Sequence, residues 1–109
     1  MKPLPRVTLP TVLVLRCAYE FSSEGLWGLE ISKLTGLKTG TVYPILDRLE
    51  TLGWLSSGWE ISDARSGPRR RVYMLTEDAQ IELTTLFKNG VNADNLAAWT
   101  VALKGSQVV

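Results

Sequence analysis

The feature that most constrains the fold is a run of apolar residues at helical spacing in the middle of the chain. These residues recur at intervals of three, one, three and three positions: Val42, Ile45, Leu46, Leu49 and Leu52. That spacing places them on one face of an α-helix. Thr39 or Thr41 is expected to cap the helix, with Pro44 in or just after its first turn, and Gly53 is expected to end it.

The segments on either side of this helix favour a winged helix-turn-helix. A shorter helix is predicted over residues 28–35, ended by Gly36. Two helices joined by a glycine-containing turn are typical of a helix-turn-helix. After Gly53, residues 54–60 and 71–75 resemble two strands, and the Gly/Pro-containing stretch 62–70 between them indicates a hairpin turn. The sequence therefore predicts a mainly α fold with a small β-hairpin.

Helices are also expected at both ends of the chain. Thr8 is the predicted cap of a first helix that is apolar nearly all round and must be covered on two sides, either by a partner chain or by another element of the same chain. Thr76 is the predicted cap of a helix that Asn89 and Gly90 end. A last helix is expected from Asn92 or Asp94 to Lys104, closed by Gly105, with residues 106–109 frayed.

The chain length limits the domain organisation. A chain of 109 residues and 12.1 kDa is the size of one ordinary domain. We expect residues 1–88 to form the winged helix-turn-helix and residues 89–109 a short C-terminal helical segment that could take part in dimerisation.

The absence of particular residue types excludes most enzyme classes. With no His and a single Cys, the chain cannot form a Cys/His zinc site, an internal disulfide or a His-based triad. No catalytic residue, metal or cofactor is predicted, and Cys17 is expected to be a small buried hydrophobe. Lys2 and Arg6 precede an apolar stretch as in a secretory leader, but Pro10 interrupts it. No stretch reaches the ~20 apolar residues that a membrane span needs, so a cytoplasmic protein without membrane contact is expected.

Positive charge gathers in the predicted helix-turn-helix and hairpin. Although the whole chain has a formal charge of +1, residues 33–71 carry seven basic and four acidic residues. Four arginines stand close together in the hairpin without an acid between them, and they are the candidate wing contacts to DNA: Arg65, Arg69, Arg70 and Arg71. A solvated loop is the alternative, and Arg71 could instead pair within the sheet.

The polar residues at the start of the central helix are the candidates for contact with bases and phosphates. They are expected to face away from the apolar side: Lys38, Thr39, Gly40, Thr41, Tyr43, Pro44 and Arg48. Lys38 is the first choice for a phosphate contact. The alternative is that they are ordinary cap and surface residues, with Tyr43 half-buried.

Several segments together resemble the PadR-like family of transcriptional regulators. The similarity covers roughly residues 9–88 and is carried by GLEI at 28–31, GLKTGTVYPIL at 36–46, RLE at 48–50, LGWL at 52–55, GPRR at 67–70 and YMLTE at 73–77. The resemblance implies a winged-helix homodimer that binds operator DNA as a repressor, and in some members a phenolic or drug-like effector. The break at residues 89–92 makes the C-terminal helix shorter than is usual in the family.

The tryptophans and the last helix complete the list of candidates. Leu96, Trp99 and Leu103 share one side of that helix and are possible dimer or effector contacts, Trp99 either stacking on a flat aromatic effector or packing at a seam. Trp59 is expected to share a strand face with Leu55 and to cover the first helix. The predicted function is sequence-specific binding of double-stranded DNA. The alternative is a winged helix that binds another regulator or a polymerase subunit.

Overall fold

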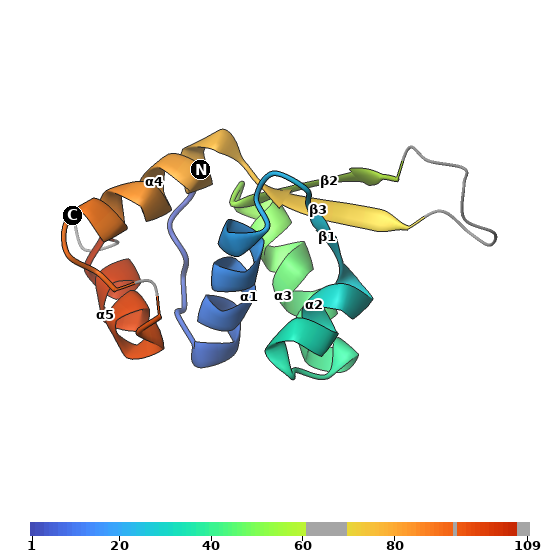
Figure 1. Cartoon of the computed structure of the whole chain (residues 1–109), viewed down its shortest axis with the longest axis horizontal. Helices are drawn as coiled ribbons and strands as arrows, with labels where there is room; N and C mark the ends of the chain where they lie inside the picture. The colour runs from blue at the N-terminus through green and yellow to red at the C-terminus, as the bar shows by residue number, and fades with distance from the viewer. Residues whose placement is uncertain (61–69, 93, 107–109) are drawn as a thin grey trace.

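The computed structural model describes residues 1–60, 70–92 and 94–106. These residues form helices and strands in the following order: α1 (Leu9–Glu20), β1 (Leu26–Trp27), α2 (Gly28–Thr35), α3 (Thr39–Thr51), β2 (Leu55–Trp59), β3 (Arg71–Leu75), α4 (Glu77–Lys88) and α5 (Leu96–Ser106). Figure 1 shows α2 and α3 beside the base of the β2/β3 hairpin, which extends from the helical body. The predicted winged helix-turn-helix with a C-terminal helix is confirmed. The predicted hairpin turn at 62–70 and the predicted fraying at the C-terminus lie almost entirely outside the described residues.

The turn between α2 and α3 has the glycine that the sequence predicts. Gly36 adopts a left-handed φ of 77°, and its N–H donates to the Ser32 carbonyl. The Ser32 hydroxyl in turn donates to the Leu37 carbonyl at 2.5 Å. These bonds complete the C-terminus of α2 and set the direction in which α3 begins.

The start of α3 differs from the prediction. Lys38, not Thr39 or Thr41, is the N-cap residue, because its carbonyl already accepts the N–H of Val42 at 3.0 Å. Both threonine side chains are exposed and make no capping bond. Pro44 consequently lies in the second turn, where it has no N–H to donate to the Gly40 carbonyl.

The end of α3 is as predicted. Gly53 has a φ of 85°, its N–H donates to the Glu50 carbonyl, and the N–H of Trp54 donates to the Leu49 carbonyl. This pair of bonds is the Schellman motif, which leads the chain from α3 into β2.

The sheet has one strand more than the predicted hairpin. β2 and β3 pair antiparallel from Leu55 opposite Leu75 to Trp59 opposite Arg71, as expected. The two-residue strand β1 pairs with the other edge of β3. It was missed because two residues cannot display a strand periodicity. Gly25 precedes it with a φ of 76°, where a Cβ would lie 2.6 Å from the Val72 side chain.

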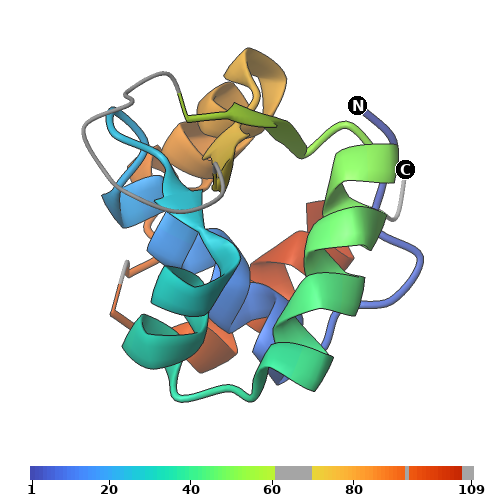
Figure 2. The same ribbon diagram turned by 90° about the vertical axis from the view of Figure 1, so that its right-hand side faces the viewer.

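The first helix is covered within the chain itself. α1 lies at the centre of the molecule, with α5 on one side and α2 and α3 on the other (Figures 1 and 2). Its Thr8 cap is confirmed, since the hydroxyl accepts the N–H of Thr11. Cys17 is buried, as predicted. Because α5 supplies the second cover, the apolar character of α1 does not require a partner chain.

The C-terminal helix begins and ends later than predicted. The side chain of Asn92 accepts the N–H of Asp94 in a preceding turn, and Asn95 then caps the helix by accepting the N–H of Ala98 at 3.1 Å. The helix continues to Ser106, so Gly105 does not close it. Asn89 and Gly90 do follow the end of α4, where Gly90 has a φ of 97°.

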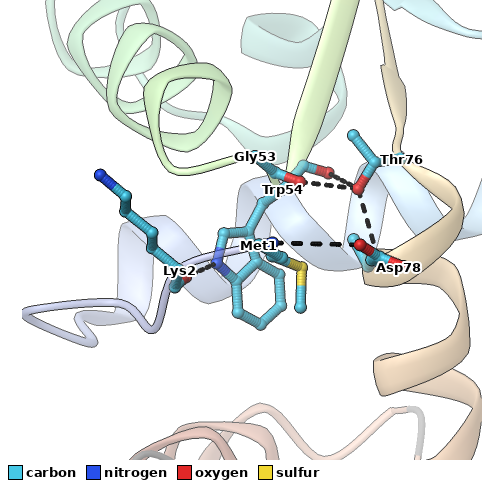
Figure 3. A network of polar contacts seen from close by, with 7 residues as sticks. Met1, Lys2, Gly53, Trp54, Thr76 and Asp78 are labelled. Atoms are coloured by element: carbon cyan, nitrogen blue, oxygen red, sulfur yellow. Dashed lines mark hydrogen bonds and ion pairs between the residues drawn. The ribbon is translucent and has the colours of Figure 1, made fainter.

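The N-terminal segment is fastened to the junction of α3, β2 and α4 (Figure 3). The Trp54 indole N–H donates to the Lys2 carbonyl at 2.8 Å, and the N-terminal ammonium group of Met1 lies 3.9 Å from the Asp78 carboxylate. Thr76 caps α4 as predicted, accepting the N–H of Ala79, while its hydroxyl donates to the Gly53 carbonyl at 2.7 Å.

The expected position of Trp59 is wrong. Its side chain is 61% exposed at the outer end of β2 and does not cover α1. The hairpin extends beyond the helical body (Figure 1). The strand face that is buried at Leu55 is therefore open to solvent at Trp59. Within the described residues, no helix has both the length and the apolar character needed to cross a bilayer.

Candidate nucleic-acid interface

The two faces of α3 are separated as the sequence predicts. Its apolar face is buried against the core through Val42, Ile45, Leu46 and Leu49. All the candidate contact residues on this helix are exposed: Lys38, Thr39, Gly40, Thr41, Tyr43, Pro44 and Arg48. The structure thus brings them together on one solvent-facing surface, which we call the α3 surface.

The N-terminal end of α3 favours an anion. Its first turn contains no acidic residue, and Lys38 adds a full positive charge to the partial positive charge of the helix terminus. The hydroxyls of Thr39 and Thr41 are exposed in the same turn. Hydrogen-bond donors beside a positive helix end can bind phosphate oxygens or base edges.

Tyr43 connects the α3 surface to the start of α2. The side chain is 43% exposed, and its ring lies so close to Gly28 that a Cβ at position 28 would be 2.4 Å from a ring carbon. The alternative of a half-buried Tyr43 therefore describes its position well. The partial burial leaves the ring supported on one side and open to solvent on the other.

The four candidate wing arginines have different positions. Arg65 and Arg69 lie outside the described residues. Arg70 directly precedes β3, and its guanidinium carbon lies 3.9 Å from the centroid of the Trp27 ring, a cation–π contact. Arg71 is the first residue of β3.

Arg71 pairs within the fold, as the alternative proposed. It donates to the Ser57 hydroxyl at 2.9 Å and to the Glu50 carboxylate at 3.4 Å. Its guanidinium also lies 6.0 Å from the centroid of the Tyr73 ring. Burial raises the pKa of Tyr73, and the nearby Arg71 charge only partly opposes this shift. The Tyr73 phenol is therefore neutral near pH 7, and the ion pair of Arg71 is with the Glu50 carboxylate.

A hollow of about 230 Å³ lies between the start of α2, α3 and the first residues of β3. Trp27, Gly28, Tyr43 and Arg70 are among the residues that line it. Trp27 and Gly28 were not among the candidate residues. In the sequence they are only the residues at the start of a short helix. The pairing of β1 with β3 brings Trp27 near Arg70, and the packing of α2 against α3 brings Gly28 near Tyr43.

The C-terminal candidates lie inside the chain. Trp99 and Leu103 are almost fully buried, and the Trp99 ring has edge contacts with Phe87 at 5.0 Å and Tyr19 at 6.4 Å between centroids. Leu96 is partly buried against the same core. Because the chain's own helices cover Trp99 and Leu103, a dimer or effector contact through them stays a prediction.

Comparison with known proteins agrees with this arrangement. Residues 23–85 match the family described as "Transcriptional regulator PadR-like family". The search of curated proteins found no match.

Solved structures from several bacteria are similar in fold. The crystal structure of smu.1704 from Streptococcus mutans UA159 has 31% identity and a TM-score of 0.58, and the match covers 72% of this chain and 76% of that one. A PadR family transcription regulator from Clostridium difficile R20291 has 26% identity and a TM-score of 0.58, over 72% of this chain and 84% of that one. The S. aureus MepR–DNA complex has 20% identity and a TM-score of 0.62, over 92% and 80% of the two chains, a likeness of fold alone.

Proposed function

Because the chain belongs to the PadR-like family, whose members are transcriptional regulators and not enzymes, we propose that it is a sequence-specific, double-stranded DNA-binding protein that acts as a homodimeric repressor. The observation that carries the proposal is the α3 surface, where exposed polar and basic residues stand at a positively charged helix end. Its place of action would be the cytoplasm, with the DNA.

In this proposal α3 enters the major groove with its N-terminal end toward the bases. Thr39 and Thr41 would contact base edges, because they stand on the first turn of the helix, and Tyr43 would contact the backbone through its hydroxyl. Lys38 and Arg48 would contact phosphates. The wing arginines, Arg65, Arg69 and Arg70, would contact the neighbouring backbone or minor groove.

A dimer would present two such surfaces to a symmetric operator. One recognition helix contacts only a few base pairs, whereas two related by a two-fold axis bind half-sites about one helical turn apart. Leu96, Trp99 and Leu103 remain the proposed contacts of α5 with a partner chain or a small aromatic effector. Since Trp99 and Leu103 are buried, such a contact would require α5 to move from α1.

The test is selection of binding sites from a random pool of duplex DNA across a salt series, followed by sedimentation of the complex. The expected result is an enriched inverted repeat bound by two chains, with log K falling as log salt rises. Lys38→Ala should weaken binding to all sequences alike, and Thr41→Ala should change the preferred sequence.

Other results would contradict the proposal. Weak binding without enrichment of any sequence, or an affinity insensitive to salt, would favour the alternative function, a winged helix that binds another protein. An enriched site without inverted symmetry, bound by one chain, would contradict the dimer alone.

A further inference from the structure

The start of α2 contacts both elements that are proposed to bind DNA. Trp27, at the end of β1, lies under Arg70 of the wing, and Gly28, the first residue of α2, lies under Tyr43 of α3. We infer that Trp27 and Gly28 are positioning residues, which hold Arg70 and Tyr43 at one hollow so that both can bind the same stretch of DNA backbone. This inference rests on the proposed function.

Gly28 is needed here for close approach and not for its backbone conformation. Its φ is not in the left-handed region, but a Cβ would lie 2.4, 2.6 and 2.7 Å from Cε1, Cζ and the hydroxyl oxygen of Tyr43. Those atoms are the outer end of a side chain, so an alanine would push the ring away and leave the backbone in place. The glycine therefore determines where the Tyr43 hydroxyl lies.

Trp27 fixes Arg70 in a similar way. Pairing with Val72 of β3 holds the backbone of Trp27 in place, and the side chain is partly buried. Arg70 lies two residues before Val72, and its guanidinium rests 3.9 Å from the ring centroid. An arginine side chain without such a contact would sample many rotamers, and ordering it before binding lowers the entropic cost of the contact.

The two contacts have one result, because Arg70 and Tyr43 line the same hollow of about 230 Å³. A guanidinium and a phenol hydroxyl are both donors that bind phosphate oxygens. Arg70 and Arg71 both line the hollow. Arg71 is ion-paired with Glu50. Among the residues that the structure describes, no carboxylate pairs with Arg70, so its charge is available to a phosphate. We therefore assign a backbone phosphate of the duplex as the occupant.

Glycine variants test the first half of the inference. Gly28→Ala should weaken binding of the selected duplex by about tenfold, the order of one lost hydrogen bond to a charged group, while leaving the thermal midpoint nearly unchanged. Gly58→Ala is the matched control, because a Cβ at Gly58 meets nothing within 4 Å. In a Tyr43→Ala background, Gly28→Ala should have no further effect on affinity, since it acts through the displaced ring.

Tryptophan variants test the second half. Trp27→Ala should flatten the slope of log K against log salt by about 1, as loss of one phosphate contact does. In an Arg70→Ala background, Trp27→Ala should cause no further flattening. Trp27→Phe should restore most of the slope, because a phenyl ring still offers a face to the guanidinium. A protein with merely weakened packing would show lower stability with an unchanged slope.

The outcomes separate this inference from the proposed function. In the free protein, the Tyr43 ring current should shift the Gly28 α-proton NMR signals, and Tyr43→Leu should abolish the shift. If wild-type protein shows that shift but binds no duplex, the proposed function fails and the inference fails with it. Two results would overturn the inference alone, in a wild-type protein that binds the duplex. One is that Gly28→Ala and Trp27→Ala bind as tightly as wild type. The other is that Gly28→Ala loses as much affinity in the Tyr43→Ala background as in wild type, and Trp27→Ala as much in the Arg70→Ala background.

Discussion

Arg71, the first residue of β3, donates a hydrogen bond across 3.4 Å to the carboxylate of Glu50 in α3. Ser57 of β2 joins the pair, since it accepts a bond from Arg71 and donates one to Glu50. The outer part of the β2/β3 ladder is therefore fastened to the C-terminal half of α3, and Arg71 already has a carboxylate partner in the free protein.

The first prediction concerns the two described wing arginines. Arg70→Ala should flatten the slope of log K against log salt by about 1, whereas Arg71→Ala should flatten it less, because Glu50 already neutralises Arg71. Fluorescence anisotropy of a labelled operator duplex across a salt series measures both slopes. Equal flattening by the two variants would mean that Arg71 leaves Glu50 on binding.

The second prediction concerns the packing of α5. Trp99→Ala should lower the free energy of unfolding by about 3–5 kcal/mol, the usual cost of removing a large buried aromatic side chain, since Trp99 is 1% exposed. Val101→Ala on the same helix is the control and should change it by less than about 0.5 kcal/mol, because Val101 is 70% exposed. Urea denaturation measures both. Similar costs would contradict the packing of α5 on α1.

The third prediction concerns the cap of α4. Thr76→Ala removes the hydroxyl that accepts the N–H of Ala79 and donates to the Gly53 carbonyl, and it should cost about 1–2 kcal/mol of stability. Thr76→Ser keeps both bonds and should retain most of that stability. If the serine variant is as unstable as the alanine variant in thermal denaturation, the methyl group and not the hydroxyl is responsible.

The fourth prediction concerns pH. Burial raises the pKa of the Cys17 thiol from its ordinary value of 9.0 to about 11, with Glu20 and Glu30 adding to the shift and Arg16 opposing it. Because the folded state holds the proton more tightly, the stabilisation is complete below pH 9 and is lost as the pH rises toward 11.

Across that range the wild-type protein should lose about 1.4 kcal/mol of stability per pH unit relative to Cys17→Ala, which lacks the titrating thiol. Urea denaturation of both proteins at a series of alkaline pH values measures the difference. A constant difference across the series would show that the folded protein does not resist ionisation of Cys17.

Local patterns predicted most of the helices and the hairpin correctly. The period of Val42, Ile45 and Leu46 identified the buried face of α3, and Gly36 and Gly53 marked where α2 and α3 end. These signals are readable because the backbone bonds and side-chain contacts that they report lie within a few residues of each other. The same reasoning chose the wrong cap for α3, since Lys38 starts the helix without any side-chain bond.

Contacts between distant segments were not readable in this way. The sequence showed that α1 needs cover on two sides, and the fold decided that α5 supplies it. Trp59 was expected inside and is exposed, because the position of a strand end relative to the body depends on the whole hairpin. β1 is identified as a strand only by its backbone pairing with β3, which the sequence pattern of two residues cannot predict.

By itself, the sequence determined the helix-turn-helix, the hairpin and the clustering of positive charge, because each depends on residue type and spacing along a short stretch of chain. The tertiary structure alone decided that Gly28 supports Tyr43 and that Trp27 supports Arg70. Those residues are 15 and 43 positions apart in the sequence, and no local periodicity connects them. They meet because burial of the apolar faces of α1, α2 and α3 in one core brings the start of α2 against both α3 and the wing.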